Sequence, residues 1–434
     1  MSMDATLQEI PEQQRTELES FPNVEATGIG PRVVDGVTTD EIAVVIFVRE
    51  KVPESQLATS EVVPKEVEIE GKTYKTDVQN LGGEIRIQEL QESQGSAEPT
   101  VVPVPKIPAE AEVHTEPEVE AIPDSLSRKE QWRPAPAGVS VGHPNITAGT
   151  LGTPPLVTQS GKRVFLTNAH VAAPIGESST GDNILQPGKY DGGTESIGRL
   201  LEFSEITKGE ANRTDSALVE VEPDVLQHDI LGVWENLRGW RSAQFNRDHV
   251  KSGRTTNITT GRLRARNVTA NVYGYFPNEP AKFEGLDLFT AMSAGGDSGS
   301  LIGIEESDGF YGTDLLFAGS NQVTLGIPME TVQDEHGRLE PMTSQDLVGP
   351  DDLRITGTHF TGTLSPKQTL YRWSGPWAER YVVDFDARPT TNGGWIESRV
   401  HSTYRSSAGV YYLLELRNRK NSATNFEVKY LLAR

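Results

Sequence analysis

The chain has 434 residues, of which 24% are charged and 35% hydrophobic, and its formal net charge is −22. This length suggests about three domains, and the acidic balance disfavours nucleic acid or an anionic membrane as the main partner. Because cysteine is absent, a disulfide framework, a thiol nucleophile and any cysteine-ligated metal are excluded. No apolar run approaches about eighteen residues, and the N-terminus lacks a basic and apolar leader, so we expect a cytoplasmic protein without a membrane segment.

The residue pattern of the first part of the chain predicts a small α+β domain. Residues 5–20 predict a short acidic helix, and the segment from Ala26 to Lys51 predicts two strands around a turn rich in Gly, Asp and Thr. Further short strands and turn signals follow. We therefore expect an N-terminal α+β domain over residues 1–92.

A proline- and glutamate-rich stretch comes next. Between Ser96 and Pro123 there are six prolines, six glutamates, one lysine and no aromatic residue. Such a composition cannot bury enough apolar surface to offset the entropy lost on ordering. The stretch predicts an extended acidic linker over residues 93–136.

Two segments with β-type residue patterns follow the linker. Residues 137–349 consist of short β-type runs punctuated by Gly, Pro, Asn and Asp, which predicts a barrel or sandwich. Residues 350–434 predict a C-terminal β-sandwich. From Asp351 onward this tail carries 12 basic and 8 acidic residues, and its Tyr, Trp and Arg content suits recruitment of a protein partner.

Three short segments of the central part carry candidate catalytic residues. RVFLTNAHVAA delivers His170 from an apolar strand, NRTDSALVEV places Asp215 before a strand-like run, and SAGGDSGSLI holds Ser298 between glycines. Hydrolysis through serine needs a base, an acceptor that orients the base, and backbone donors for the oxyanion. The three residues predict nucleophile Ser298, general base His170 and orienting acceptor Asp215.

The glycines around Ser298 predict the backbone donors. A tight turn over residues 295–298 would direct the N–H groups of Gly296 and Ser298 at one point, which makes an oxyanion hole.

Each element of this reading has a structural alternative. A histidine at a strand end is often a hydrogen-bonded structural residue, and the glycine-rich turn can be a plain loop. Asp215 can be a turn aspartate, and Asp182, Asp191 and Asp224 are rival orienting residues. The joint occurrence of all three groups, in one order within one all-β segment, favours the catalytic triad.

At this point the chain resembles the trypsin/chymotrypsin-like serine peptidases, through TNAHV, TDSAL and GGDSGS over residues 137–345. The stretch VKSGRTTNITTG is similar to SGRTTG of bacterial members. A narrower likeness, carried by NILQPGKYDGG, LLFAGSNQVTLGIPM and the N-terminal block, is to the group that includes plant NARROW LEAF 1. The resemblance implies a mainly β, two-barrel core with the site between the barrels, and an endopeptidase that acts through an acyl-enzyme without a cofactor.

The resemblance also implies the substrate pocket. The residue six positions before the nucleophile, Met292, would lie at the base of the S1 pocket, and Phe317, Ala318 and Gly319 would form its wall. Because Met292 has no charge, it offers no partner to a substrate Lys or Arg, so an apolar or small P1 residue is expected.

The resemblance implies that Asp297, beside the nucleophile, is partly buried, and an unpaired buried carboxylate is costly, so a cation is expected next to it. No activation sequence precedes Gly138, so a side chain must supply the charge. Lys251 is the first candidate by the resemblance to bacterial members, and Arg254 is the second because its fork binds a carboxylate bidentately. The alternative is that Asp297 bonds only to backbone amides or water. With the pairing, the enzyme is active as translated, without a cleavage step.

The remaining expectations concern ligands and partners. The acidic segment from Glu305 to Asp314 lacks the spacing of a calcium loop and is read as a solvated loop, so no metal is expected. The expected partners are a protein or peptide substrate and a protein bound by the tail. We expect the N-terminal domain to regulate or cover the cleft. A second hypothesis is a peptidase fold without activity that serves as a scaffold through its flanking domains.

Overall fold

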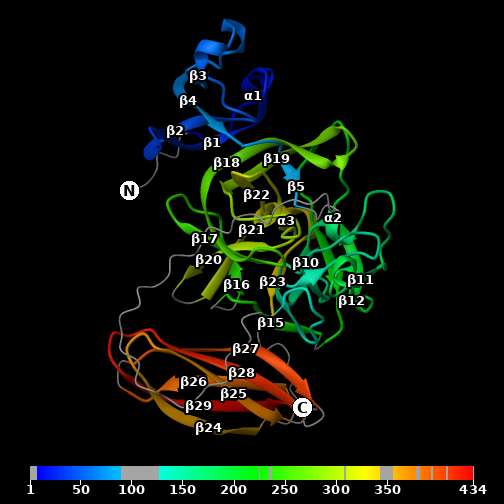
Figure 1. Ribbon diagram of the computed structural model, residues 1–434, viewed down its shortest axis with the longest axis vertical. Coiled ribbons are helices and arrows are strands. Elements are labelled where there is room, and N and C mark those ends of the chain that lie inside the picture. Colours follow the sequence, from blue (N-terminus) through cyan, green and yellow to red (C-terminus); the bar gives the residue numbers. More distant parts are fainter. Residues whose placement is uncertain are drawn as a thin grey trace.

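The computed structural model describes residues 7–88 and 127–433, apart from 224, 234–236, 307–308, 343–354, 378–381, 392–393 and 407–408. The fold is mainly β, as the sequence predicts (Figure 1). The described part contains three α-helices: α1 (Glu12–Glu19), α2 (Ala169–Ala172) and α3 (Met329–His336). None of its helices is long and apolar enough to cross a membrane.

The N-terminal part forms four strands against helix α1, drawn in blue in Figure 1. Its strands and 3-10 turns are β1 (Val24–Val34), β2 (Val37–Val48), η1 (Glu54–Gln56), η2 (Thr59–Glu61), β3 (Glu66–Ile69) and β4 (Lys72–Asn80). The predicted first hairpin is present, and Asp35 and Gly36 make its turn with φ of 51° and 79°. Helix α1 begins at Glu12 rather than residue 5, directly after Pro11, where a missing N–H is harmless.

The first barrel of the central part is built on a six-stranded sheet in the order β11-β12-β14-β10-β9-β23. Its strands are β9 (Leu156–Thr158), β10 (Arg163–Thr167), β11 (Asn183–Leu185), β12 (Ser196–Phe203), β14 (Ala217–Glu220) and β23 (Leu339–Pro341). A 3-10 turn, η3 (Lys189–Asp191), follows β11. Two small sheets complete this part: β6 (Ala135–Ala137) with β15 (Leu226–Ile230), and β7 (Ser140–Val141) with β8 (Gly149–Thr150).

The second barrel is a closed ring of six strands, because β18 pairs with both β17 and β19. The ring contains β17 (Asp248–Gly253), β18 (Asn257–Phe276), β19 (Glu279–Thr290), β20 (Leu301–Glu306), β21 (Gly309–Gly319) and β22 (Val323–Pro328). Three short strands attach to it: β5 (Arg86–Ile87), β13 (Ala211–Asn212) and β16 (Leu237–Trp240).

The N-terminal strands continue the sheet of the second barrel. Strand β1 pairs antiparallel with β18, with Ala26 opposite Ala270 and Thr27 opposite Thr269. Leu81 is fully buried within the same hydrophobic cluster as the two barrels. The N-terminal domain and the second barrel are therefore joined by backbone hydrogen bonds as well as by packing.

The end of the predicted linker is part of the core. Arg128 is 7% exposed, and its guanidinium donates to the carbonyl oxygens of Gly138 and Leu231 and to the Ser252 hydroxyl. Ala135 is fully buried in β6. The folded core thus begins by residue 127 and not at residue 137, and residues 93–126 of the predicted linker lie outside the described residues.

The tail consists of two three-stranded sheets, as predicted for a β-sandwich (orange and red in Figure 1). One sheet has the order β24-β29-β26 and the other β25-β28-β27; their strands are β24 (Ile355–Leu364), β25 (Thr369–Trp377), β26 (Val382–Pro389), β27 (Ile396–Ser406), β28 (Gly409–Asn418) and β29 (Thr424–Ala433). Side chains from both sheets, among them Phe385, Leu416 and Phe426, pack into one buried cluster.

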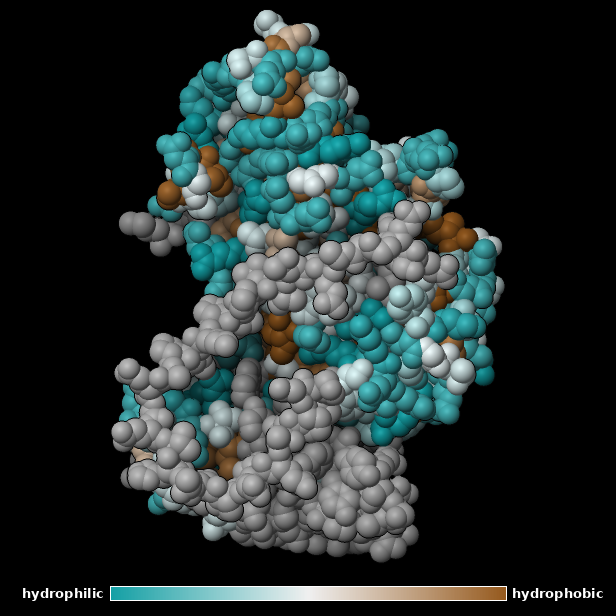
Figure 2. Space-filling view, viewed as in Figure 1, coloured by the Kyte–Doolittle hydropathy of each residue, from teal (hydrophilic) through white to brown (hydrophobic). Residues whose placement is uncertain are grey.

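The described surface is mostly hydrophilic on the face seen in Figure 2. Apolar side chains appear there as small separate patches. The large apolar side chains that are exposed in the described part are few: Val34, Val37, Ile175, Tyr190 and Trp395. Val34 and Val37 lie opposite each other in the β1–β2 hairpin. A few exposed apolar residues of this kind are ordinary on a folded protein.

Two carboxyl groups are buried in the second barrel. Asp287 of β19 and Asp314 of β21 flank β22 and are 3% and 0% exposed. The solvated loop predicted for the segment that ends at Asp314 is wrong for residues 309–314, which are strand, with their backbone paired to β20 and β22. Burial raises the pKa of Asp287 to about 6 and, together with the charge of Asp287, raises the pKa of Asp314 well above its ordinary value.

We expect this pair to make the protein less stable as the pH rises. A carboxyl whose pKa is higher in the folded state binds its proton more tightly there, so folding gains stability at low pH and loses it above the unfolded pKa near 4. For Asp287 the loss falls between pH 4 and about 6 and is on the order of 3 kcal/mol. The Asp287→Asn variant should flatten this decline in the free energy of unfolding, measured by urea titration from pH 4 to 8. Asp248→Asn, at an exposed ion pair, is the control and should keep the wild-type slope.

Candidate catalytic site

His170 and Asp215 meet at one edge of the first barrel. Strand β10 leads into the short helix α2, which carries His170, and Asp215 lies directly before β14. Since β10 and β14 are antiparallel neighbours with Thr167 opposite Ala217, the end of one strand and the start of the other are adjacent. The pairing register therefore brings together two residues that are 45 positions apart in the sequence.

The Asp215 carboxylate holds His170 through two groups. One oxygen, Oδ1, accepts the backbone N–H of His170 at 3.0 Å, and the other, Oδ2, is bonded to the ring nitrogen Nδ1. The Asn168 amide donates to the Asp215 carbonyl oxygen at 2.7 Å, which fixes the backbone of the aspartate. With Nδ1 bonded to the carboxylate, Nε2 is the ring nitrogen that would act as the base.

Asp215 is fully buried and remains ionised. Burial opposes its ionisation, but the charge of His170 and the hydrogen bonds from His170 and Tyr275 outweigh burial and hold the pKa of Asp215 below its ordinary value. A buried carboxylate of this kind both orients an imidazole and stabilises the imidazolium that forms when it takes up a proton.

Tyr275 is a residue of this site that the sequence analysis missed. Its hydroxyl donates to Oδ2 of Asp215 at 2.5 Å, and its ring meets the His170 ring edge-on with centroids 6.0 Å apart. Tyr275 comes from β18 of the second barrel, 60 residues after Asp215. No motif surrounds it, so only the three-dimensional arrangement reveals the contact.

Two of the rival aspartates are engaged elsewhere. Asp191 receives the guanidinium of Arg254 and the Ser140 hydroxyl. Asp182 lies near another histidine, His143, with 3.5 Å between Oδ2 and Nε2. Asp224 lies outside the described residues. Of the described candidates, Asp215 is the one bonded to His170.

Ser298 lies in a tight turn before β20. Gly296 and Gly299 on either side have φ of 93° and 91°, a region in which residues with a Cβ are strained. The Ser298 hydroxyl is fully buried and donates to the Phe317 carbonyl oxygen at 3.2 Å, while its own carbonyl oxygen accepts from Thr150 of the first barrel at 2.8 Å.

The turn is packed against the His170 segment. A Cβ placed on Gly149 would be 2.4 Å from the side chain of Val171, the residue after His170, and 3.0 Å from the carbonyl oxygen of Ser298. Gly149 thus allows the nucleophile turn and helix α2 to lie side by side. The structure brings the three predicted catalytic residues to the junction of the two barrels.

The predicted oxyanion donor Gly296 already binds a carbonyl oxygen. Its backbone N–H donates to the oxygen of Gln88 at 2.6 Å. An oxyanion hole binds an oxygen of the same kind in a substrate, so the donor is correctly directed for that role. A Cβ on Gly296 would lie 2.5 Å from the Thr255 hydroxyl, so the turn also has no room for a larger residue.

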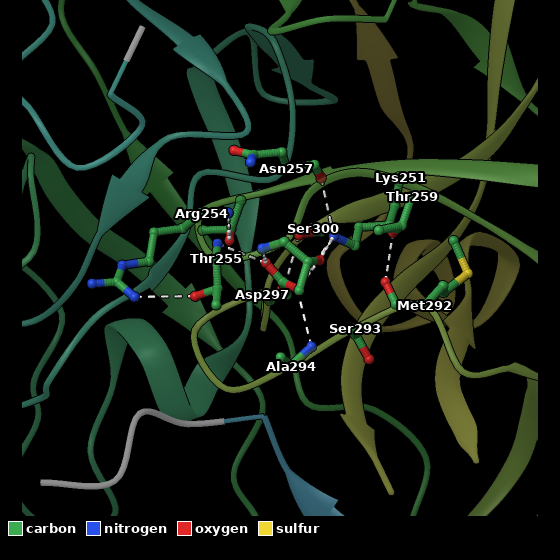
Figure 3. Close-up of polar contacts among 12 residues, drawn as sticks. Lys251, Arg254, Thr255, Asn257, Thr259, Met292, Ser293, Ala294, Asp297 and Ser300 are labelled. Atoms are coloured by element: carbon green, nitrogen blue, oxygen red, sulfur yellow. Dashed lines mark hydrogen bonds and ion pairs between the residues drawn. The ribbon is translucent and has the colours of Figure 1, made fainter. Parts of the chain in front are cut away.

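Five donors bind the Asp297 carboxylate, and Figure 3 shows the surroundings of this residue. Both Asp297 and Lys251 are completely buried, and the ammonium Nζ lies 3.2 Å from Oδ2. The other donors are the backbone N–H groups of Thr255, Thr256 and Ala294 and the Thr256 hydroxyl. Burial opposes ionisation of Asp297, but Lys251 and these hydrogen bonds outweigh it and lower the pKa of the carboxyl.

Arg254, the second candidate cation, does not pair with Asp297. Its guanidinium binds Asp191 through Nε at 2.9 Å and through Nη2, and it lies 5.5 Å from the centroid of the Tyr190 ring. The side-chain stem of Arg254 packs beside Gly296. The bidentate fork was expected correctly, but its carboxylate partner is on the first barrel, so Arg254 joins the two barrels beside the nucleophile turn.

The predicted pocket residues lie in two places. Met292 is 4% exposed and packs in a cluster with Leu263 and Phe289, with its sulfur beside Gly261. Residues 317–319 form the end of β21, and this end pairs with β5 of the N-terminal part. That Met292 and residues 317–319 shape the pocket stays a prediction; in the structure, Ala318 and Gly319 pair with β5 of the same chain.

A scan against protein-family models finds no match, and a search of curated protein sequences finds none. Solved structures of serine proteases are similar to this chain over 48% of its length. They include protease A of Thermobifida fusca (20% identity, TM-score 0.36) and the Nocardiopsis protease (18%, 0.36), each covered over 100% of its length. The Cellulomonas bogoriensis chymotrypsin is 19% identical with a TM-score of 0.35 and is covered over 98%.

Proposed function

We propose that the protein is a serine endopeptidase that hydrolyses peptide bonds through an acyl-enzyme. The observation that carries the proposal is the buried His170–Asp215 pair lying against the Ser298 turn, in which a backbone N–H is directed at a carbonyl oxygen. A general base, its orienting carboxylate, a serine and an oxyanion donor are the groups that acyl transfer needs.

In the proposed reaction His170 accepts the hydroxyl proton of Ser298 at Nε2 while the serine oxygen attacks the substrate carbonyl carbon. Gly296 and Ser298 stabilise the oxyanion through their backbone N–H groups. His170 then gives the proton to the leaving amine, and water repeats the sequence on the ester. Asp297, held by Lys251, keeps the turn in the geometry that directs the donors.

The finer resemblance, to the group that includes plant NARROW LEAF 1, belongs to this proposal and rests on the sequence blocks quoted above. The substrate is proposed to be a protein or peptide, and the C-terminal sandwich is proposed to bind a protein partner. No observation favours the inactive scaffold, because the residues needed for catalysis are retained.

A fluorophosphonate probe tests the proposed activity, because it reacts with an activated serine. We expect one label on Ser298, lost in Ser298→Ala and kept in the matched control Ser179→Ala, which alters an exposed serine. Since Gln88 covers Ser298, the probe is also applied to the Gln88→Lys chain, whose new charge weakens that contact. If neither folded chain is labelled, the peptidase proposal is contradicted.

A further inference from the structure

The end of the N-terminal part lies in the catalytic site as an extended strand. Strand β5 pairs antiparallel with the end of β21, with Ile87 opposite Ala318 and Arg86 opposite Gly319. Addition of a strand to an open sheet edge is a general way of binding an extended peptide, with backbone bonds giving the affinity. The segment 85–88 is therefore bound in the form in which proteases bind substrates.

Gln88 makes two of the backbone contacts that a cleaved residue makes. Its N–H donates to the Phe317 carbonyl oxygen at 3.0 Å, and its carbonyl oxygen accepts from Gly296 at 2.6 Å. The first bond fixes the residue on the strand edge, and the second places its carbonyl group on the oxyanion donor. Phe317 also accepts from the Ser298 hydroxyl, so Gln88 and the nucleophile share one carbonyl partner.

The side chain of Gln88 enters the neighbourhood of the predicted pocket wall. It is 8% exposed, and its amide nitrogen lies 2.7 Å from the point where a Cβ on Gly319 would stand. Only glycine at position 319 leaves this space free. The residue seen in the site is thus polar and uncharged, unlike the apolar or small residue that Met292 suggests.

Contacts on the preceding residues hold the segment in place. The Ile85 carbonyl oxygen accepts from the backbone of Tyr273 at 2.8 Å, and the Ile85 side chain is fully buried. Full burial of such a side chain stabilises by about 1.5–3 kcal/mol. Ile87 packs against Gly274, and Glu84 forms an ion pair with Arg49 at 3.2 Å. The segment is docked by its own specific contacts.

We propose that the chain cleaves itself between Gln88 and Glu89, with Gln88 as the acyl residue; this rests on the proposed peptidase function. The Ser298 oxygen bonds to the Gln88 carbonyl carbon, His170 takes the serine proton, and the bond to the Glu89 nitrogen breaks as that nitrogen receives the proton. Water then hydrolyses the ester, which leaves a Gln88 carboxylate and restores Ser298. The products are residues 1–88 and residues 89–434.

Formation of the catalytic site and access to it depend on different parts of the chain. The Lys251–Asp297 pair sets the nucleophile turn without any new N-terminus, as expected from the sequence. An external substrate does not reach Ser298 while Gln88 occupies the site, because Ser298 is then 0% exposed. Cleavage therefore acts on the occupant of the cleft and leaves the assembly of the turn unchanged.

The experiment follows the full-length chain by intact mass and N-terminal sequencing. We expect the wild-type chain to give a new N-terminus at Glu89, and Ser298→Ala to stay intact. Gln88→Lys puts an unpaired charge into a buried position and should slow cleavage at least about 10-fold, corresponding to about 1.4 kcal/mol. The matched control Gln56→Lys changes an exposed glutamine of the same domain and should be cleaved at the wild-type rate.

Fluorophosphonate labelling, read on the same samples, separates the two proposals. A label on Ser298 in either chain without cleavage at Gln88–Glu89 overturns self-cleavage and leaves the peptidase function standing. Absence of both label and cleavage, in folded wild-type and Gln88→Lys chains, is the failure of the peptidase function itself. Equal rates for wild type and Gln88→Lys overturn the assignment of Gln88.

A dilution series tests whether the chain cuts itself or its neighbour. Because the segment and Ser298 belong to one chain, the first-order rate constant should not change over a 100-fold dilution. Ser298→Ala chains mixed with wild type should remain uncut at Gln88. Cleavage of the Ser298→Ala chain at the wild-type rate would overturn the intramolecular step.

Discussion

Replacing Asp215 with asparagine should lower kcat by about 10⁴-fold, the order of magnitude known for loss of the charge at such a position. Asp215 accepts from the backbone N–H and from Nδ1 of His170 and from the hydroxyl of Tyr275. An asparagine has the same shape but turns one acceptor into a donor. It therefore favours the histidine tautomer with the proton on Nε2, which cannot accept the serine proton.

The measurement is kcat for a peptide ester, which reports the serine and its base. Asp182→Asn is the matched control, because Asp182 also lies near a histidine of the first barrel and was a rival candidate in the sequence. It should retain nearly full activity. The catalytic reading of Asp215 fails if Asp215→Asn keeps wild-type kcat, or if the two variants lose activity equally while both remain folded.

Replacing Lys251 with alanine should reduce both stability and turnover. It leaves the buried Asp297 carboxylate without its cation, and removal of one member of a buried ion pair costs about 3–5 kcal/mol. The turn that directs the Gly296 N–H loses one of its supports, and loss of one oxyanion donor lowers kcat by about 10²-fold. Urea unfolding and kcat for the same peptide ester measure the two effects.

Two other variants show whether the loss in Lys251→Ala comes from the unpaired buried charge of Asp297. Lys208→Ala changes a surface lysine paired with Glu279. It should change the free energy of unfolding by no more than about 1 kcal/mol and should leave kcat close to the wild-type value. Combining Lys251→Met with Asp297→Asn removes both charges and should recover stability relative to Lys251→Ala, because no unpaired charge remains buried. Wild-type stability and kcat in Lys251→Ala would refute a supporting role for the pair.

Much of the fold could be predicted because its signals are local. An apolar run and a turn rich in Asp and Gly predict the hairpin over residues 24–48, and the structure contains this hairpin. The all-β nature of the central part and of the tail follows from short runs between turn residues. The candidate triad was found because each member lies in a short distinctive segment near His170, Asp215 or Ser298.

What the sequence did not reveal depends on pairing over long distances. Tyr275 reaches Asp215 because β18 continues well beyond the residues that pair with β17, which end at Arg262. Arg128 lies in a segment whose composition resembles the linker, yet it is buried, and its guanidinium donates to two carbonyl oxygens and one hydroxyl from three separate regions. The placement of Gln88 beside β21 also depends on the pairing of β5 with β21, two strands that lie more than 200 residues apart in the sequence.

The continuous sheet formed by β1 and β18 has a further consequence. While the chain is intact, the segment ending at Gln88 is a tethered ligand whose effective concentration at the cleft is set by the tether, so dilution cannot relieve occupancy. Once the covalent connection is cut, the same surface becomes an ordinary bimolecular interface. Its occupancy then follows mass action, and the partly exposed ion pair of Lys282 with Glu19 makes the interface sensitive to salt.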